Sequence, residues 1–160
     1  MVLFKTSAGK WFDLGLSAST LASLVPAPLP LIIRELGGSG APLVVLHGLL
    51  GSSRNWQSAG VALAERGHRV LAPDTHGAGK GPAWPTDRPL TLSDEVDLLE
   101  PLLARAGSPF ALVGHSYGGA VITEAGNQPN VQALVYIAAF APDSGESPGG
   151  ITQQHLPEAA

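Results

Sequence analysis

The residues best suited to chemistry in this 160-residue chain are Gly114, Ser116 and Gly118, which are spaced as Gly-x-Ser-x-Gly. The apolar run at residues 110–113 predicts a buried strand, and residues 119–125 favour a helix. A serine at such a strand-to-helix turn is strained and exposed, and the electropositive start of the helix points toward its oxygen. The pattern predicts a nucleophile at Ser116. The alternative is a glycine-rich turn that happens to hold a serine.

A second turn with polar groups follows another predicted strand. Residues 41–46 are apolar and β-branched, and His47 and Gly48 come directly after them. In open α/β sheets, ligands bind beyond the carboxyl ends of the parallel strands. We therefore expect this turn and the turn at Ser116 to face the same crevice.

Together these motifs resemble the α/β-hydrolase fold family over roughly residues 31–150. His47 and Gly48 look like the family's oxyanion turn, residues 69–79 like its next strand and loop, and residues 131–143 like its sixth strand. The resemblance implies an α/β fold, with a mostly parallel sheet flanked by helices. It also implies that Ser116 is the nucleophile and that the backbone N–H groups of Leu49 and Tyr117 form the oxyanion hole.

In the family that the chain resembles, the serine is followed by an acid and then by a histidine. Here Asp143 follows the last predicted strand, Glu146 is a nearby substitute, and His155 is the one histidine after Ser116. Asp143 and His155 are therefore the candidate acid and base. The alternative is that Asp143 caps a loop and that His155 is a surface residue.

The resemblance also bears on domain organisation. The family's histidine usually follows a later strand, so we expect a hydrolase fold that lacks its C-terminal part. Residues 31–143 are expected to form the partial core, and residues 144–160 a tail or the start of a cap. Residues 1–30 match the family poorly and are an N-terminal segment of uncertain structure. Within the core, residues 31–36 and 41–46 are expected to pair as a hairpin, and Thr91 and Asp94 to cap a helix.

Composition excludes several classes of function. Hydrophobic residues make up 44% of the chain and charged residues 14%, which fits a well-buried core. The net charge of −4 without a basic stripe excludes nucleic acid as the expected partner. No apolar run is long enough for a membrane span, no metal-ligand spacing is found, and no cofactor is expected. We expect a cytoplasmic protein, with secretion as the alternative because lysines precede an apolar stretch near the N-terminus.

These observations predict a serine hydrolase that acts on small carboxylic esters. A carboxylate is usual at the corresponding position of epoxide hydrolases and dehalogenases, so Ser116 argues against both activities. The alternative is a non-catalytic fragment, or a ligand-binding or interaction module of the same fold. The apolar strand at residues 131–140 would lie at an uncovered edge, which predicts a homo-oligomer formed through this strand.

Overall fold

The structure is a computed structural model that describes residues 3–5, 11–13, 33–107 and 109–154. Near the N-terminus, β1 (Leu3–Lys5) and β2 (Trp11–Asp13) pair as antiparallel strands. A five-stranded sheet contains β3 (Ile33–Glu35), β4 (Pro42–Leu46), β5 (Arg69–Pro73), β6 (Phe110–His115) and β7 (Val131–Ile137). The helical elements are η1 (Ser53–Trp56), α2 (Gln57–Glu65), α3 (Leu92–Ala106), α4 (Tyr117–Ala125) and α5 (Pro148–Gln154).

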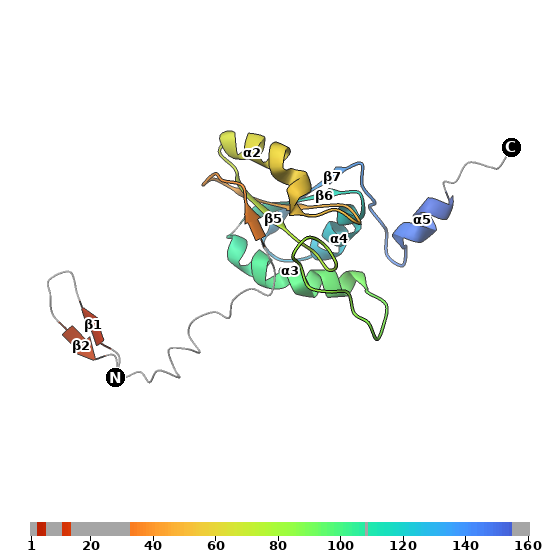
Figure 1. The fold of residues 1–160 in the computed structure, drawn as a ribbon. Coiled ribbons are helices and arrows are strands. Elements are labelled where there is room, and N and C mark those ends of the chain that lie inside the picture. The colour runs from red at the N-terminus through yellow and green to blue at the C-terminus, as the bar shows by residue number, and fades with distance from the viewer. Residues whose placement is uncertain (1–2, 6–10, 14–32, 108, 155–160) are drawn as a thin grey trace.

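The larger sheet is mostly parallel. Its strand order is β3-β5-β4-β6-β7, and β4 pairs in parallel with both β5 and β6, as β6 does with β7. Only β3 is antiparallel to its neighbour, β5. Helices lie on both faces of this sheet (Figure 1). The predicted α/β class, with a mostly parallel sheet flanked by helices, is confirmed.

The core lies on both faces of the sheet because the central strands are apolar on both sides. On one face, Val44 and Leu46 of β4 pack with the buried side chains of α3 and α4. On the other face, Val45 of β4 packs with Trp56 and with residues of α2. Continuous apolar runs of this kind are typical of strands buried in a parallel sheet.

The expected hairpin between residues 31–36 and 41–46 is wrong. Instead β3 pairs with β5, and the chain crosses the start of β5, near His68, before it enters β4. The crossing is tight: Gly38 has φ +78°, and a Cβ there would lie only 1.7 Å from the carbonyl oxygen of His68. The local pattern indicated two consecutive strands correctly, but β4 already has β5 and β6 as parallel partners on its two sides.

The predicted capping box of α3 is confirmed. The Thr91 side chain accepts a hydrogen bond from the amide of Asp94, whose carboxylate in turn accepts one from the amide of Thr91. The helix buries one face against the sheet, and the buried face includes a carboxylate, Glu95. This helix therefore carries a carboxyl group on its buried face.

The last strand, β7, lies at an edge of the five-stranded sheet and ends at Ile137 rather than at residue 140. Apolar side chains are exposed along it: Val135 is 43% exposed, Tyr136 38% and Ile137 44%. A long apolar edge strand is a template for pairing with another chain. The homo-oligomer inferred from the sequence stays a prediction.

Candidate functional site

The backbone at Ser116 adopts an unusual conformation. Ser116 lies between β6 and α4 with φ +53° and ψ −122°, a region that residues other than glycine rarely enter. The surrounding chain holds it there, since its N–H donates to the carbonyl of Ile137 and its own carbonyl accepts from the amides of Gly119 and Phe140. The end of β7 thus fixes the turn at the end of β6.

Two glycines beside Ser116 allow the chain to fold this tightly. A Cβ on Gly114 would lie 2.5 Å from the carbonyl oxygen of Gly118, and a Cβ on Gly118 would lie 2.8 Å from the carbonyl oxygens of Leu46 and His47. Both distances are shorter than real Cβ contacts, so any side chain here would push the backbone segments apart. The Gly-x-Ser-x-Gly spacing therefore lets the turn close and lets α4 approach the end of β4.

The turn after β4 lies against Ser116, as the sequence predicts. A Cβ on Gly48 would lie 3.0 Å from the Cβ of Ser116. Beyond Gly48 the chain turns sharply: the amide of Gly51 donates to the carbonyl of Gly48, and Leu50 has φ +61°. No hydrogen bond joins the amide of Leu49 to another described residue. Tyr117 is the first residue of α4, where the helix offers its N–H no partner.

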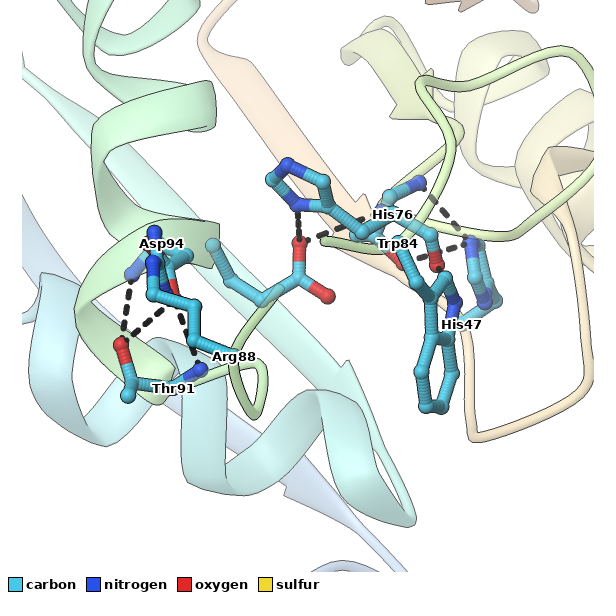
Figure 2. A network of polar contacts seen from close by, with 8 residues as sticks. His47, His76, Trp84, Arg88, Thr91 and Asp94 are labelled. Atoms are coloured by element: carbon cyan, nitrogen blue, oxygen red, sulfur yellow. Dashed lines mark hydrogen bonds and ion pairs between the residues drawn. The ribbon is translucent and has the colours of Figure 1, made fainter. Parts of the chain in front are cut away.

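His47 holds this turn in place from within the protein. Its Nδ1 lies 2.9 Å from the carbonyl oxygen of Gly48, and its Nε2 accepts a hydrogen bond from the amide of Thr75 at 3.3 Å (Figure 2). A carbonyl oxygen can only accept, so Nδ1 carries a proton and donates it to Gly48, while Nε2 uses its lone pair to accept from Thr75. Because both ring nitrogens are engaged and the side chain is buried, His47 shapes the turn.

A cavity of about 530 Å³ opens beside these two turns. Leu49 and Tyr117 line it on one side, and Trp84 and Leu90, from the loop between β5 and α3, line it on the other. Burial raises the pKa of the Tyr117 phenol to about 12, and the nearby charge of Glu95 adds to this rise. The phenol therefore stays protonated over the whole neutral range.

A partly buried histidine and a buried carboxylate form a pair in the same cavity. The Nδ1 of His76 lies 2.9 Å from Oε2 of Glu95, which also accepts from the amide of His76 at 3.2 Å (Figure 2). Glu95 is only 1% exposed, and both residues line the cavity. Trp84 covers the loop by donating from its indole N–H to the carbonyl of His76 at 2.8 Å.

The sequence reasoning missed this pair. The available signal was the position of Glu95, four residues before Leu99 on the face of α3 that faces the core. A carboxylate on a buried helix face requires a partner, and the loop between β5 and α3 supplies His76.

An ion pair joins the loop between β5 and α3 to the helix that follows it. Arg88 donates from both terminal guanidinium nitrogens to the carboxylate of Asp94, at 2.7 Å for the Nη1–Oδ2 pair (Figure 2). The Arg88 hydrogen bonds hold the pKa of Asp94 well below its usual range, with help from Thr91. This pair ties the loop to the first turn of α3.

Asp74, at the end of β5, is an anchor for two loops. Its Oδ1 accepts from the amide of Ser53 at 2.7 Å, and its Oδ2 accepts from the amide of Lys80 at 3.0 Å. Burial alone would raise the pKa of Asp74, but the hydrogen bonds from Lys80 and Ser53 outweigh it and hold the pKa below its usual value. The carboxylate joins the start of η1 to the loop after β5.

The structure does not bring the candidate acid into contact with Ser116. Asp143 is exposed in a turn closed by its amide, which donates to the Glu146 carboxylate at 2.9 Å, and by the amide of Glu146, which donates to the carbonyl of Asp143. His155 lies outside the described residues. The segment between them reaches the site, because Pro148 of α5 lines the 530 Å³ cavity.

Comparison with known proteins identifies the family. Residues 43–159, which include both turns and the loop with His76, match the Alpha/beta hydrolase family. The chain belongs to this family.

Within the described residues, no group of three or more His, Cys, Asp or Glu side chains could hold a metal ion. No helix in the described part of the chain is both long and apolar enough to cross a membrane.

Individual relatives of this family member are hydrolases. It is 35% identical over 120 residues to the carbendazim hydrolyzing esterase of Nocardioides sp. (strain SG-4G), covering 73% of this chain and 49% of the relative. It is 33% identical over 128 residues to sn-1-specific diacylglycerol lipase ABHD11 of Danio rerio, covering 78% of this chain and 39% of the relative. The chain thus spans about half or less of the length of these curated relatives.

Solved structures agree with the family assignment. A marine microorganism esterase aligns with a TM-score of 0.61 and 26% identity, over 79% of this chain and 49% of that one. The epoxide hydrolase VrEH1 from Vigna radiata aligns with a TM-score of 0.61 and 27% identity, over 66% of this chain and 34% of that one. The fold of this chain therefore corresponds to part of the solved hydrolases.

Proposed function

We propose that this chain is a serine hydrolase for small carboxylic esters and that Ser116 is its nucleophile. The observation that carries the proposal is the backbone of Ser116, with φ +53° between a strand and a helix. Such a conformation costs free energy and persists only where the surrounding structure imposes it, which is common at active sites. Relatives described as an esterase and a lipase support the same reaction class.

In the proposed reaction, the Ser116 hydroxyl attacks the ester carbonyl and the alcohol leaves. The negative charge on the carbonyl oxygen is stabilised by the N–H groups of Leu49 and Tyr117. An acyl-enzyme forms on Ser116, and water then releases the acid and frees the serine. The contact between Gly48 and Ser116 supports this assignment, since it brings the turn that carries Leu49 beside the serine.

For the acid and the base we propose Asp143 and His155. Their order after Ser116 matches the serine, acid, histidine order of the fold. The position of α5 supports the proposal, because Pro148 between the two residues lines the cavity beside Tyr117. The proposal requires the imidazole of His155 to come within hydrogen-bond distance of the Ser116 hydroxyl when substrate is bound.

The experiment compares Ser116→Ala and His155→Ala in the hydrolysis of a short p-nitrophenyl ester. Removing a member of a working triad costs about 10⁴-fold or more in turnover, so both variants should lose activity to that extent. Equal activity of wild type and Ser116→Ala would remove the serine mechanism. Full activity of His155→Ala, with Ser116→Ala inactive, would remove His155 as the base and keep Ser116.

A second candidate function is a non-catalytic module that binds small molecules in the same cavity. The hydrogen bonds at both ring nitrogens of His47 favour it. With both nitrogens engaged, this histidine cannot act as the base that takes a proton from Ser116. The two functions differ in a simple measurement. A binding module would retain the ligand unchanged, whereas a hydrolase releases alcohol and acid from it.

A further inference from the structure

A second cavity, of about 840 Å³, lies on the other side of Leu50 from the 530 Å³ cavity, which we call the apolar cavity. It is lined by β3, the turn into η1 and the loop after β5. Three cationic side chains, Arg34, Arg54 and Lys80, come from these three segments. We call this cavity the basic cleft.

Both carboxylates that line the basic cleft already have partners of their own. Glu35 pairs with Arg69, with 3.1 Å between Oε1 and Nη2. Asp74 has both carboxylate oxygens occupied by backbone amides, at 2.7 and 3.0 Å. Neither carboxylate forms an ion pair with Arg34, Arg54 or Lys80 in the described part of the chain.

Arg34, Arg54 and Lys80 therefore have no ion-pair partner among the described residues. Arg34 donates from Nη1 to the neutral side chain of Gln57 at 3.4 Å, and its buried Nε has no hydrogen-bond partner. Arg54 and Lys80 are exposed at the rim. The three cations outnumber the two carboxylates in the lining, and an excess of positive charge in a cleft concentrates anions there, even in a chain whose net charge is −4.

One residue, Leu50, lies between the basic cleft and the cavity beside Tyr117. Leu50 lines both cavities, is 95% exposed and has φ +61°. Its neighbour Leu49 lines the apolar cavity and carries one of the proposed oxyanion N–H groups. A molecule that crosses Leu50 would place one end among Trp84 and Leu90 and the other end among the cations.

We infer that the basic cleft binds an anionic oxygen group, a carboxylate or a phosphate, on substrates whose apolar part occupies the 530 Å³ cavity. This inference rests on the proposed function and names its substrate class as anionic esters. Guanidinium and ammonium groups form strong charge-assisted hydrogen bonds with both kinds of anion. The cleft would raise affinity and orient the ester, while the reaction itself would take place at Ser116.

Binding can be tested without catalysis by using the Ser116→Ala variant. Calorimetry would measure the affinity for phenyl phosphate, benzoate and benzyl alcohol, which share a ring and differ in charge. We expect at least one of the anions to bind about tenfold more tightly than the neutral alcohol. Combining Arg54→Gln with Lys80→Gln should abolish that preference, and raising the salt concentration should weaken it.

The matched control is Arg66→Gln, because Arg66 is an exposed arginine of the chain outside the cleft. It should leave the anion preference unchanged. The inference is overturned if neither anion binds better than benzyl alcohol, or if Arg66→Gln reduces the preference as much as the cleft variants do. A preference for phenyl phosphate or for benzoate would identify which anion the cleft takes. If the anions bind but Ser116 of the wild-type protein is unreactive, the anion site is supported and the proposed hydrolase activity is rejected.

Discussion

Gly48 and Ser116, which are 68 residues apart in the chain, are packed so closely that a Cβ at position 48 would lie 3.0 Å from the Cβ of Ser116. The same added atom would lie 3.2 Å from Nδ1 of His115. These contacts couple the turn after β4 to the turn after β6. The proposed nucleophile and the proposed oxyanion donor at Leu49 therefore depend on the absence of a side chain at Gly48.

Gly48→Ala should reduce ester hydrolysis by at least tenfold while costing only about 1–3 kcal/mol of unfolding free energy. The added methyl group would displace either the Ser116 side chain or the turn that carries Leu49. Steady-state kinetics and urea unfolding measure the two effects. Gly149→Ala is the matched control, because no described atom lies within 4 Å of a Cβ at that position. Loss of activity in the control as well would argue against a specific contact at Gly48.

Much of this site could be predicted from sequence because local signals coincide with it. The Gly-x-Ser-x-Gly spacing, the apolar strands and the capping box at Thr91 each depend on residues close together in the chain. The pairing of β3 with β5 could not be predicted in this way, because it depends on which strand edge the rest of the sheet leaves unpaired. The His76–Glu95 pair was also missed, since it joins a loop to a helix face 19 residues away.

Asp74→Asn should destabilise the protein by roughly 2–4 kcal/mol at neutral pH. Asparagine carries no charge and has one acceptor oxygen, so it cannot serve the amides of both Ser53 and Lys80 as the carboxylate does. The pKa of Asp74 is lower in the folded protein than the usual 3.8 of an aspartate. Its contribution is therefore complete above about pH 4 and is lost as the pH falls through the folded pKa.

Urea unfolding of wild type and Asp74→Asn across pH 2.5 to 7 measures this effect, a range set by the usual pKa of an aspartate at about 3.9. The stability difference between the two proteins should narrow as the solution is acidified. A difference that stays constant down to the lowest pH would indicate that the carboxylate charge does not anchor the loops.

Tyr117→Phe should retain ester hydrolysis to within about threefold, because the proposed role of this residue belongs to its backbone N–H. Burial and the charge of Glu95 raise the phenol pKa to about 12, so its ionisation cannot produce a fall in activity between pH 7 and that value. Wild type and Tyr117→Phe should therefore have the same pH–rate profile on the alkaline side. A fall near pH 10 that disappears in Tyr117→Phe would assign the phenol a chemical role.

We predict that the chain self-associates through β7. The strand lies at the edge of the five-stranded sheet, and Val135, Tyr136 and Ile137 are exposed along it. Light scattering after size exclusion should give a mass above the 16.4 kDa of one chain. Ile137→Lys should shift the protein toward a monomer, because a charged side chain blocks pairing at an edge strand. A stable wild-type monomer at high concentration would rule out this interface.

The reactivity of Ser116 decides most directly whether this chain is a serine hydrolase, and mass spectrometry of the peptide labelled by a fluorophosphonate probe measures it. The probe reacts with an activated serine rather than with an exposed one. We predict a single adduct on Ser116 that is absent from Ser116→Ala, while other serines of the chain, such as Ser144, stay unlabelled. An unlabelled Ser116 in folded wild-type protein would contradict the proposed serine hydrolase.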